Sequence, residues 1–243
     1  MVSLMTVQTW IAVGAALLLS CASAQALEAG RLEAMKQALA GFRALGDAKA
    51  ASGEPLGISA PESRKLLSVL CRPDEAEKLS DLPADGYDDA VSYLITLSRV
   101  MGVVSDAADR SRSQQQITND VRELAGCWDA ALWSGRAALV IANRMASEDP
   151  EILKDPESRA ALAKLHQGVA LTLEGTLDAF RLAGIGAPWC EARLRAISAV
   201  VDTAARSFSP EQKRRLRETI EFAAACGPGA KAGLQPAYRS LAP

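Results

Sequence analysis

The sequence predicts an all-α protein, an antiparallel helical bundle of six or seven helices stapled by two disulfides. Apolar residues recur three and four positions apart along most of the chain, which is the spacing of one helix face. Stretches in which apolar and polar residues alternate, as they do in strands, are not found. Hydrophobic residues make up 49% of the 243 residues and charged residues 23%, a composition typical of a chain that folds around a core.

The N-terminal segment has the pattern of a secretory signal peptide. No side chain before Glu28 is charged, and the apolar run Trp10–Leu19 is followed by small residues. Cleavage after Ala24 or Ala26 would fit, so residues 1–24 are interpreted as the signal. Two alternatives stay open: a lipid anchor on Cys21, and an uncleaved N-terminal membrane anchor. We expect an exported protein, periplasmic or extracellular, with no stable membrane span after cleavage.

Residues 25–60 are predicted to form an N-terminal helix and a linker. Gly46 is expected to end the helix, and Gly46–Pro61 is interpreted as the linker. The capping box Ser59–Glu62 then opens a short helix that reaches Cys71. Pro73–Gly86 is predicted to be an irregular connection. The apolar stripe of the first helix consists of Leu32, Met35, Leu39, Phe42 and Leu45.

Longer helices complete a bundle domain over residues 61–227. Asp149 and Asp155, each followed by Pro and Glu, are interpreted as helix starts, and Ser209–Gln212 as a second capping box. Residues 228–243 are predicted to be a loose tail. The apolar stripes are Ala90, Leu94, Leu97, Met101, Val104 and Ala108; Ile117, Val121, Leu124, Trp128, Leu132 and Leu139; Leu162, Leu165, Val169, Leu173, Leu177 and Phe180; Cys190, Leu194, Ile197, Val201, Ala204 and Phe208; and Leu216, Ile220 and Ala223.

Charge and motifs exclude several classes of function. Lys and Arg number 27 against 29 Asp and Glu, so no basic excess favours a nucleic-acid partner. The single histidine, His166, excludes sites that need two, and no Gly-x-Ser-x-Gly elbow is present. Asp85–Asp89 lacks the oxygen spacing of a calcium loop, and Gly184–Gly186 follows a predicted helix instead of a strand. We predict no catalytic residue, cofactor or metal ligand, and we expect His166 to be structural.

Two features suggest a surface that contacts a partner. Trp128 lies on the apolar stripe of its helix, whereas Trp133 points roughly the other way. Such a helix is either buried between neighbours or offers one indole to a partner. The densest basic run is the other candidate, facing solvent or contacting an envelope protein or an anionic surface; it comprises Lys213, Arg214, Arg215 and Arg217.

The sequence favours a protein without catalytic activity that binds a partner or joins an envelope assembly. One alternative is an envelope hydrolase that uses a pair of carboxylates. No pair stands out, because the candidate acids all occupy positions typical of solvated helix charges: Asp120, Glu123, Asp129, Glu174 and Asp178. The other alternative is a small-ligand carrier with a cavity between helices.

Four cysteines remain after Cys21, an even number that suits disulfides in an oxidising compartment. Cys190 and Cys226 each lie 18 residues from Phe208, where the turn between the last two predicted helices is centred. At about 1.5 Å per residue, both lie about 27 Å from that turn and at the same height on the hairpin. We therefore predict a Cys190–Cys226 bond, and Cys71–Cys127 follows by elimination.

Peptide mapping without reduction tests this pairing. We expect a peptide containing Cys190 linked to one containing Cys226, a bond that stabilises the fold by about 3–4 kcal/mol in the chain-entropy account. Linkage of Cys190 to Cys71 or Cys127 would show that the helices pair in another register. Four free thiols in exported material would contradict both bonds.

Overall fold

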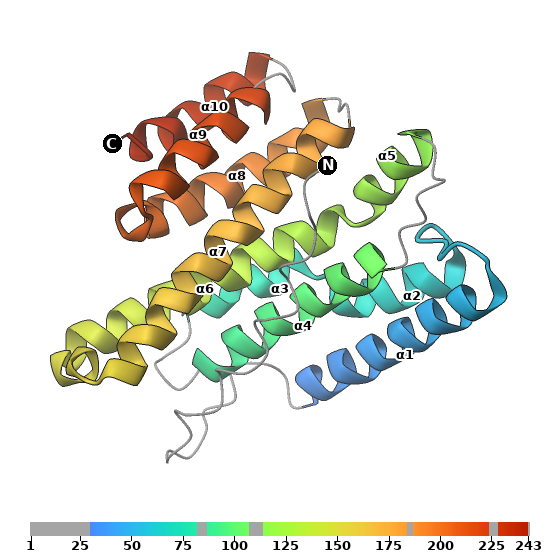
Figure 1. Cartoon of the computed structure of the whole chain (residues 1–243), viewed down its shortest axis with the longest axis horizontal. Helices are drawn as coiled ribbons and strands as arrows, with labels where there is room; N and C mark the ends of the chain where they lie inside the picture. Colours follow the sequence, from blue (N-terminus) through green and yellow to red (C-terminus); the bar gives the residue numbers. More distant parts are fainter. Residues whose placement is uncertain (1–29, 82–86, 107–113, 184–186, 224–227, 243) are drawn as a thin grey trace.

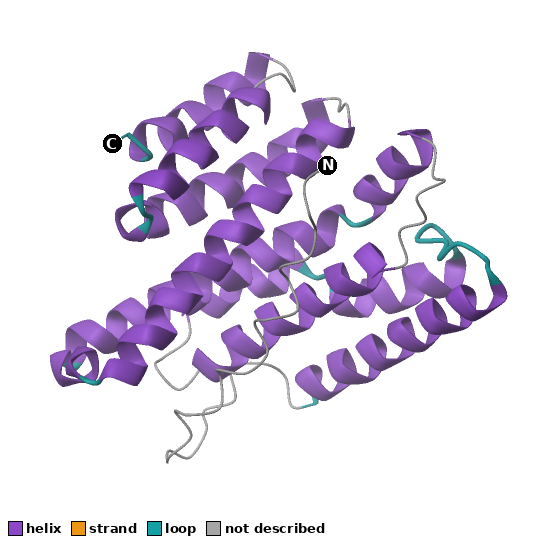
Figure 2. Ribbon diagram, in the orientation of Figure 1, coloured by secondary structure: helices purple, strands orange, loops and turns teal. Residues whose placement is uncertain are grey.

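The computed structural model describes residues 30–81, 87–106, 114–183, 187–223 and 228–242. The regular elements in these ranges are all helices, so the predicted all-α class is confirmed (Figure 2). The α-helices outnumber the six or seven predicted. They are α1 (Arg31–Ser52), α2 (Pro61–Leu70), α3 (Pro73–Lys78), α4 (Tyr87–Asp106), α5 (Gln114–Glu123), α6 (Ala125–Glu148), α7 (Pro156–Ala183), α8 (Ala187–Ala204), α9 (Pro210–Ala223) and α10 (Pro228–Ser240), with short 3-10 helices η2 (Leu79–Asp81), η4 (Pro150–Lys154) and η5 (Ala205–Ser207).

The helices are arranged around α6. Helices α1, α2 and α4 lie on one side of the molecule and α8, α9 and α10 on the other, with α6 and α7 running between them (Figure 1). Helix α6 contacts α3, α4, α7 and α8. One hydrophobic core extends from Met35 on α1 to Leu241 beyond α10. The N-terminal helix therefore belongs to the same core as the rest. Among the described residues, no helix is both long and apolar enough to cross a bilayer.

Helix α6 is surrounded because its sequence is apolar on almost every side. Every residue from Ala125 to Ala142 is buried or half-buried. The small residues of this helix let its neighbours approach closely. A Cβ added to Gly135 would lie 3.1 Å from Cγ2 of Val169 on α7. Burial on all sides is the interpretation of the two tryptophans that the structure favours.

The predicted helix starts are mostly confirmed. Ser209 and Gln212 form the expected capping box, with Ser209 N donating to Gln212 Oε1 at 2.8 Å and Gln212 N to Ser209 Oγ at 3.1 Å. Asp155 accepts from the Ser158 N–H at 2.7 Å, and Asp149 from the Glu151 N–H at 3.1 Å. The capping box predicted at residues 59–62 is wrong, because the residue before α2 is an alanine without a side-chain cap.

Two boundaries in the N-terminal half differ from the prediction. Helix α1 continues through Gly46 and ends at Gly53, whose φ of 71° suits glycine. Gly46 is instead where α4 passes close, since an added Cβ would lie 3.2 Å from Val103 Cγ1. The region predicted as an irregular connection contains α3 and η2, because Ala76 and Leu79 are both buried in the core.

Two further boundaries differ in the C-terminal half. The stripe predicted as one helix from residue 117 onwards is divided between α5 and α6 at the buried Leu124, which has a φ of −84° and a ψ of 0°. The tail predicted to be loose is wrong, because residues 228–240 form α10, packed on α8 and α9. Its buried residues are Ala230, Leu234, Ala237 and, just after it, Leu241.

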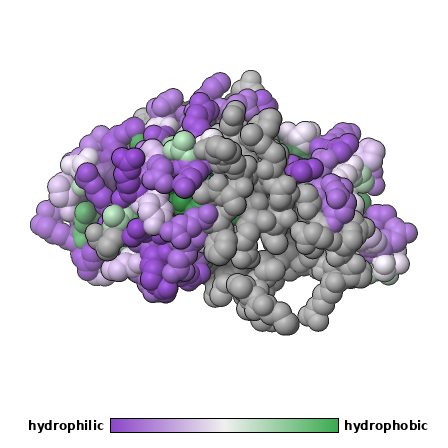
Figure 3. Space-filling model, turned by 90° about the horizontal axis from the view of Figure 1, so that it is seen from above, coloured by the Kyte–Doolittle hydropathy of each residue, from purple (hydrophilic) through white to green (hydrophobic). Residues whose placement is uncertain are grey.

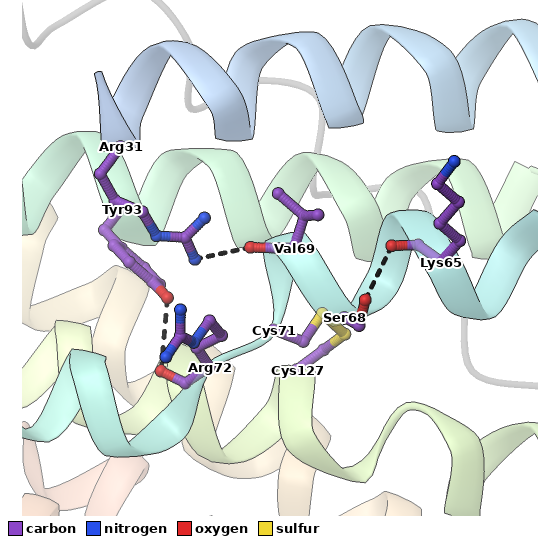
Figure 4. Close-up of a disulfide and its surroundings, with 8 residues drawn as sticks. All are labelled: Arg31, Lys65, Ser68, Val69, Cys71, Arg72, Tyr93 and Cys127. Carbon is purple, nitrogen blue, oxygen red and sulfur yellow. Dashed lines mark hydrogen bonds between the residues drawn. A yellow bond between two sulfur atoms is a disulfide. The ribbon is translucent and has the colours of Figure 1, made fainter.

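The Cys71–Cys127 disulfide is present and joins the end of α2 to the start of α6 (Figure 4). The two Cα atoms are 4.3 Å apart. Cys226 and the side chain of Cys190 lie outside the described residues, so their pairing stays a prediction. A buried polar network lies beside the disulfide: Arg31 donates to the carbonyl of Val69 at 2.6 Å and to Glu75 at 2.7 Å. Helix α1 is thereby tied to the segment that carries Cys71.

The packing of α10 gives a stability prediction. Leu234→Ala should lower the free energy of unfolding by about 2–5 kcal/mol, the usual cost of emptying a buried leucine site. Lys231→Ala, on the exposed side of the same helix, should change it by no more than about 0.5 kcal/mol. Urea unfolding of both variants measures the difference. Equal stabilities would mean that α10 adds nothing to the core.

Candidate functional site

A groove with a volume of about 670 Å³ lies between η4, the first half of α7 and the start of α9. Its apolar wall consists of Leu153, Leu162 and Ala163. Polar side chains from α7 and from the α9 capping box complete the lining. The two aspartate caps and the capping box position these segments, because each one fixes where a helix begins beside the groove.

Arg159 is the only charged residue among those that line this groove in the described structure. Its Nη1 donates to the carbonyls of Leu153 at 2.9 Å and Lys154 at 2.8 Å, both in η4. These two bonds hold the guanidinium in place at the groove. The other guanidinium nitrogens have no hydrogen-bond partner among the described residues, and the side chain is exposed.

His166 also lines the groove, in a half-buried position on α7. Burial lowers the pKa of its imidazole, so the ring is neutral at pH 7. Its Nδ1 atom is buried and has no hydrogen-bond partner in the described part of the chain. No acid or nucleophile lines the groove beside the histidine except the Ser209 hydroxyl, which caps α9.

The exposed surface of α7 extends beyond the groove. From Pro156 to Gly168 every residue of the helix is exposed or half-buried, and burial begins only at Val169. We call Ala160, Ala163, Gln167 and Leu171 the outer stripe of α7; all four are exposed. Leu153 and Leu171 are each 37% exposed and are the large apolar residues most open to solvent among those described. By contrast, the coloured residues on the face drawn in Figure 3 are mainly hydrophilic, with small separate apolar patches.

A second polar site lies inside the protein, between α6 and α8. Arg193 Nη2 and Asp129 Oδ2 are 2.9 Å apart, and the two residues are only 8% and 5% exposed. Burial raises the pKa of Asp129 to about 6, although the charge of Arg193 opposes the shift. Burial likewise lowers the pKa of Arg193, against the attraction of Asp129. Oδ1 of Asp129 has no hydrogen-bond partner among the described residues.

Sequence reasoning placed Asp129 among solvated helix acids, and this was wrong. The sequence does contain a sign of burial, because Asp129 is the one charged residue among the apolar and small residues at positions 125–135. A helix that is apolar on every side leaves no solvated position for a carboxylate. Neither the groove nor the small cavity of about 110 Å³ between α1 and α2 is lined by Asp129, so the carboxyl group has no route to a substrate in either place.

Trp133 packs inside the protein, which argues against the suggestion that its indole contacts a partner. It is 6% exposed and lies against two guanidinium groups, with Arg195 at 5.4 Å and Arg136 at 5.8 Å from the ring centroid. Arg195 in turn pairs with Glu77 on α3. These contacts cover the indole and leave little of its area for a partner.

Two of the four cations in the basic run on α9 have carboxylate partners. Arg214 pairs with Glu211 at 2.7 Å and Glu218 at 2.9 Å, and Arg215 pairs with Glu174 on α7 at 2.7 Å. The guanidinium of Arg217 lies 4.4 Å from the ring centroid of Tyr238. Lys213, Arg214, Arg215 and Arg217 therefore form a solvated helix face with a diluted positive field, which weakens the case for an anionic partner there.

Among the described residues, no three His, Cys, Asp or Glu side chains are arranged to hold a metal ion. No protein-family model, curated protein or solved structure matches the chain at a significant level. The site is therefore interpreted from its own geometry. A shallow apolar groove with one fixed cation is suited to binding, and the buried ion pair is suited to holding α6 and α8 in register.

The raised pKa of Asp129 predicts a pH-dependent stability. Below its ordinary value of 3.8 the carboxyl is protonated in both states, and between 3.8 and about 6 only the folded protein keeps the proton. Stability therefore falls as the pH rises through this window, by up to about 3 kcal/mol for a shift of this size. The side chain of Asp129→Asn cannot titrate. The free energy of unfolding of this variant, minus that of the wild type, should therefore rise by up to about 3 kcal/mol between pH 4 and pH 7.

Urea unfolding at pH 4, 5, 6 and 7 measures this difference, and other titrating groups cancel because both proteins contain them. Asp47→Asn, on the exposed face of α1, is the matched control and should follow the wild type at every pH. Parallel curves for Asp129→Asn and the wild type would rule out a raised pKa.

Proposed function

We propose that the chain is an exported protein without catalytic activity that binds a partner polypeptide in the groove between η4, α7 and α9. The observation that carries the proposal is the half-exposed first part of α7. Leu162 and Leu165 are only partly buried there, and the nearby Leu153 and Leu171 are each 37% exposed. Apolar side chains gathered beside a groove in this way are typical of interaction surfaces.

Export is supported by the signal-like N-terminus and by the Cys71–Cys127 bond, because structural disulfides persist mainly in oxidising compartments. A second bond between Cys190 and Cys226, and an antiparallel bundle arrangement, fit the same proposal. N-terminal analysis of the purified protein distinguishes a cleaved signal peptide, a lipid anchor and an uncleaved N-terminus. A start at Gln25 or Leu27 indicates a cleaved signal, an acylated Cys21 indicates a lipid anchor, and a start at Met1 in cytosolic material contradicts export.

The alternatives have less support. A carboxylate hydrolase needs two acids that reach a substrate, whereas Asp129, a described acid whose pKa is raised by burial, is buried against Arg193. A small-ligand carrier needs an enclosed cavity, usually of about 300–1,000 Å³. The groove has such a volume but is shallow and open along α7, and the cavity between α1 and α2 is about 110 Å³.

The groove gives a binding prediction. Ala163→Glu places a charged side chain in the apolar wall and should reduce partner retention at least about tenfold, the effect of ~1.4 kcal/mol. Ala40→Glu makes the same change on the exposed face of α1 and should retain the partner as well as the wild type. Tagged mature protein, incubated with envelope extract and analysed by quantitative mass spectrometry, measures retention. A protein held equally by both variants does not use the groove, and equal retention of every captured protein would contradict the proposal.

A further inference from the structure

We infer that the groove recognises a segment of a partner polypeptide in which an apolar side chain lies next to a carboxylate, with Arg159 binding the carboxylate. The inference rests on the proposed function and specifies the chemistry of the partner. Exposed apolar side chains and a single fixed guanidinium meet at this place in the described structure.

The charge of the groove selects for an anion. Arg159 is the charged member of the described lining, and the imidazole of His166 is neutral at pH 7 because burial lowers its pKa. The nearby Asp155 is not among the residues that line the groove. Its Oδ2 accepts bonds from the N–H and the hydroxyl of Ser158, each at 2.7 Å, and its negative charge offsets part of the positive charge of Arg159. An acidic group in the groove therefore meets a positive charge, whereas a basic group meets repulsion.

The guanidinium is prepared for this contact. Two bonds from Nη1 to the carbonyls of η4 restrict its rotation, so little conformational freedom remains to be lost on binding. Nη2 and Nε have no hydrogen-bond partners among the described residues. Donors on one edge of an arginine fork match the two oxygens of a carboxylate.

The length of the exposed stripe beside the groove favours a polypeptide over a free organic acid. The outer stripe of α7 runs from Ala160 to Leu171, about 16 Å at 1.5 Å per residue. A small acid would fill the groove and leave Leu171 uncovered, whereas an extended or helical segment would cover the groove and the stripe together.

A titration with small probes tests the inference. ¹⁵N-labelled mature protein is titrated with N-acetyl-leucine, which has a free carboxylate, and with N-acetyl-leucinamide, which is its neutral counterpart. Amide shifts of Ala163, Gln167 and Gln212 are followed by NMR. We expect N-acetyl-leucine to bind at least about fivefold more tightly than the amide. Arg159→Gln should abolish this difference, and Arg43→Gln, on the exposed face of α1, should preserve it.

Each other outcome contradicts a stated part of the inference. If the two probes bind the wild type with equal affinity, the groove does not recognise a carboxylate. It would still bind apolar groups, so the proposed function would survive. Absence of shifts at all three amides overturns the inference, while the Ala163→Glu experiment independently decides the proposed function. Octanoate binding more tightly than the leucine tripeptide N-acetyl-Leu-Leu-Leu would overturn the choice of a polypeptide. Circular dichroism checks that Arg159→Gln is folded. The comparison of the two probes on the wild type does not depend on this variant.

Discussion

The structure depends on the burial of α6. Over residues 125–142, α6 is apolar on almost every side, so neighbours must surround this part of the helix. Helices α3, α4, α7 and α8 do so, and the outer helices α1 and α10 then pack on that first layer. Small residues set how closely these neighbours approach, as where Val169 of α7 faces Gly135. The Cys71–Cys127 bond fixes the start of α6 to the end of α2, so one covalent link holds the central helix against the N-terminal part of the core.

Burial on this scale also explains the ion pair. Asp129 and Arg193 both lose water when α6 and α8 pack together. Burial raises the pKa of Asp129 and lowers that of Arg193, and both shifts favour the neutral form of the side chain. Attraction between them only partly offsets the cost of desolvation, so the pair adds little to stability. It does make the packing selective, because sliding α8 along α6 would leave a charge buried without its partner. We therefore interpret the pair as fixing the register of α6 and α8.

The sequence predicted most of the features that depend on neighbouring residues in the chain, the box at residues 59–62 excepted, and missed several that depend on packing. The Ser209–Gln212 box and the caps at Asp149 and Asp155 are local hydrogen bonds, and the structure contains all three. Gly46 looked like a helix end because glycine often ends helices, but contact with Val103 keeps it helical. Helix α10 looked like a loose tail because it is rich in Gly and Pro, and its order comes from packing against α8.

The candidate site was missed for the same reason. Leu162 and Leu165 follow the same three-and-four spacing as Val169 and Leu173, so the pattern alone predicts equal burial along α7. Burial is unequal: Val169, whose side chain faces Gly135 of α6, is buried, whereas the described residues before it, which line the groove with η4 and the start of α9, are exposed or half-buried. The apolar face of α7 is thus longer than the core it packs against. This apolar surface lies beside Arg159, which η4 holds in place, and the described residues leave it uncovered.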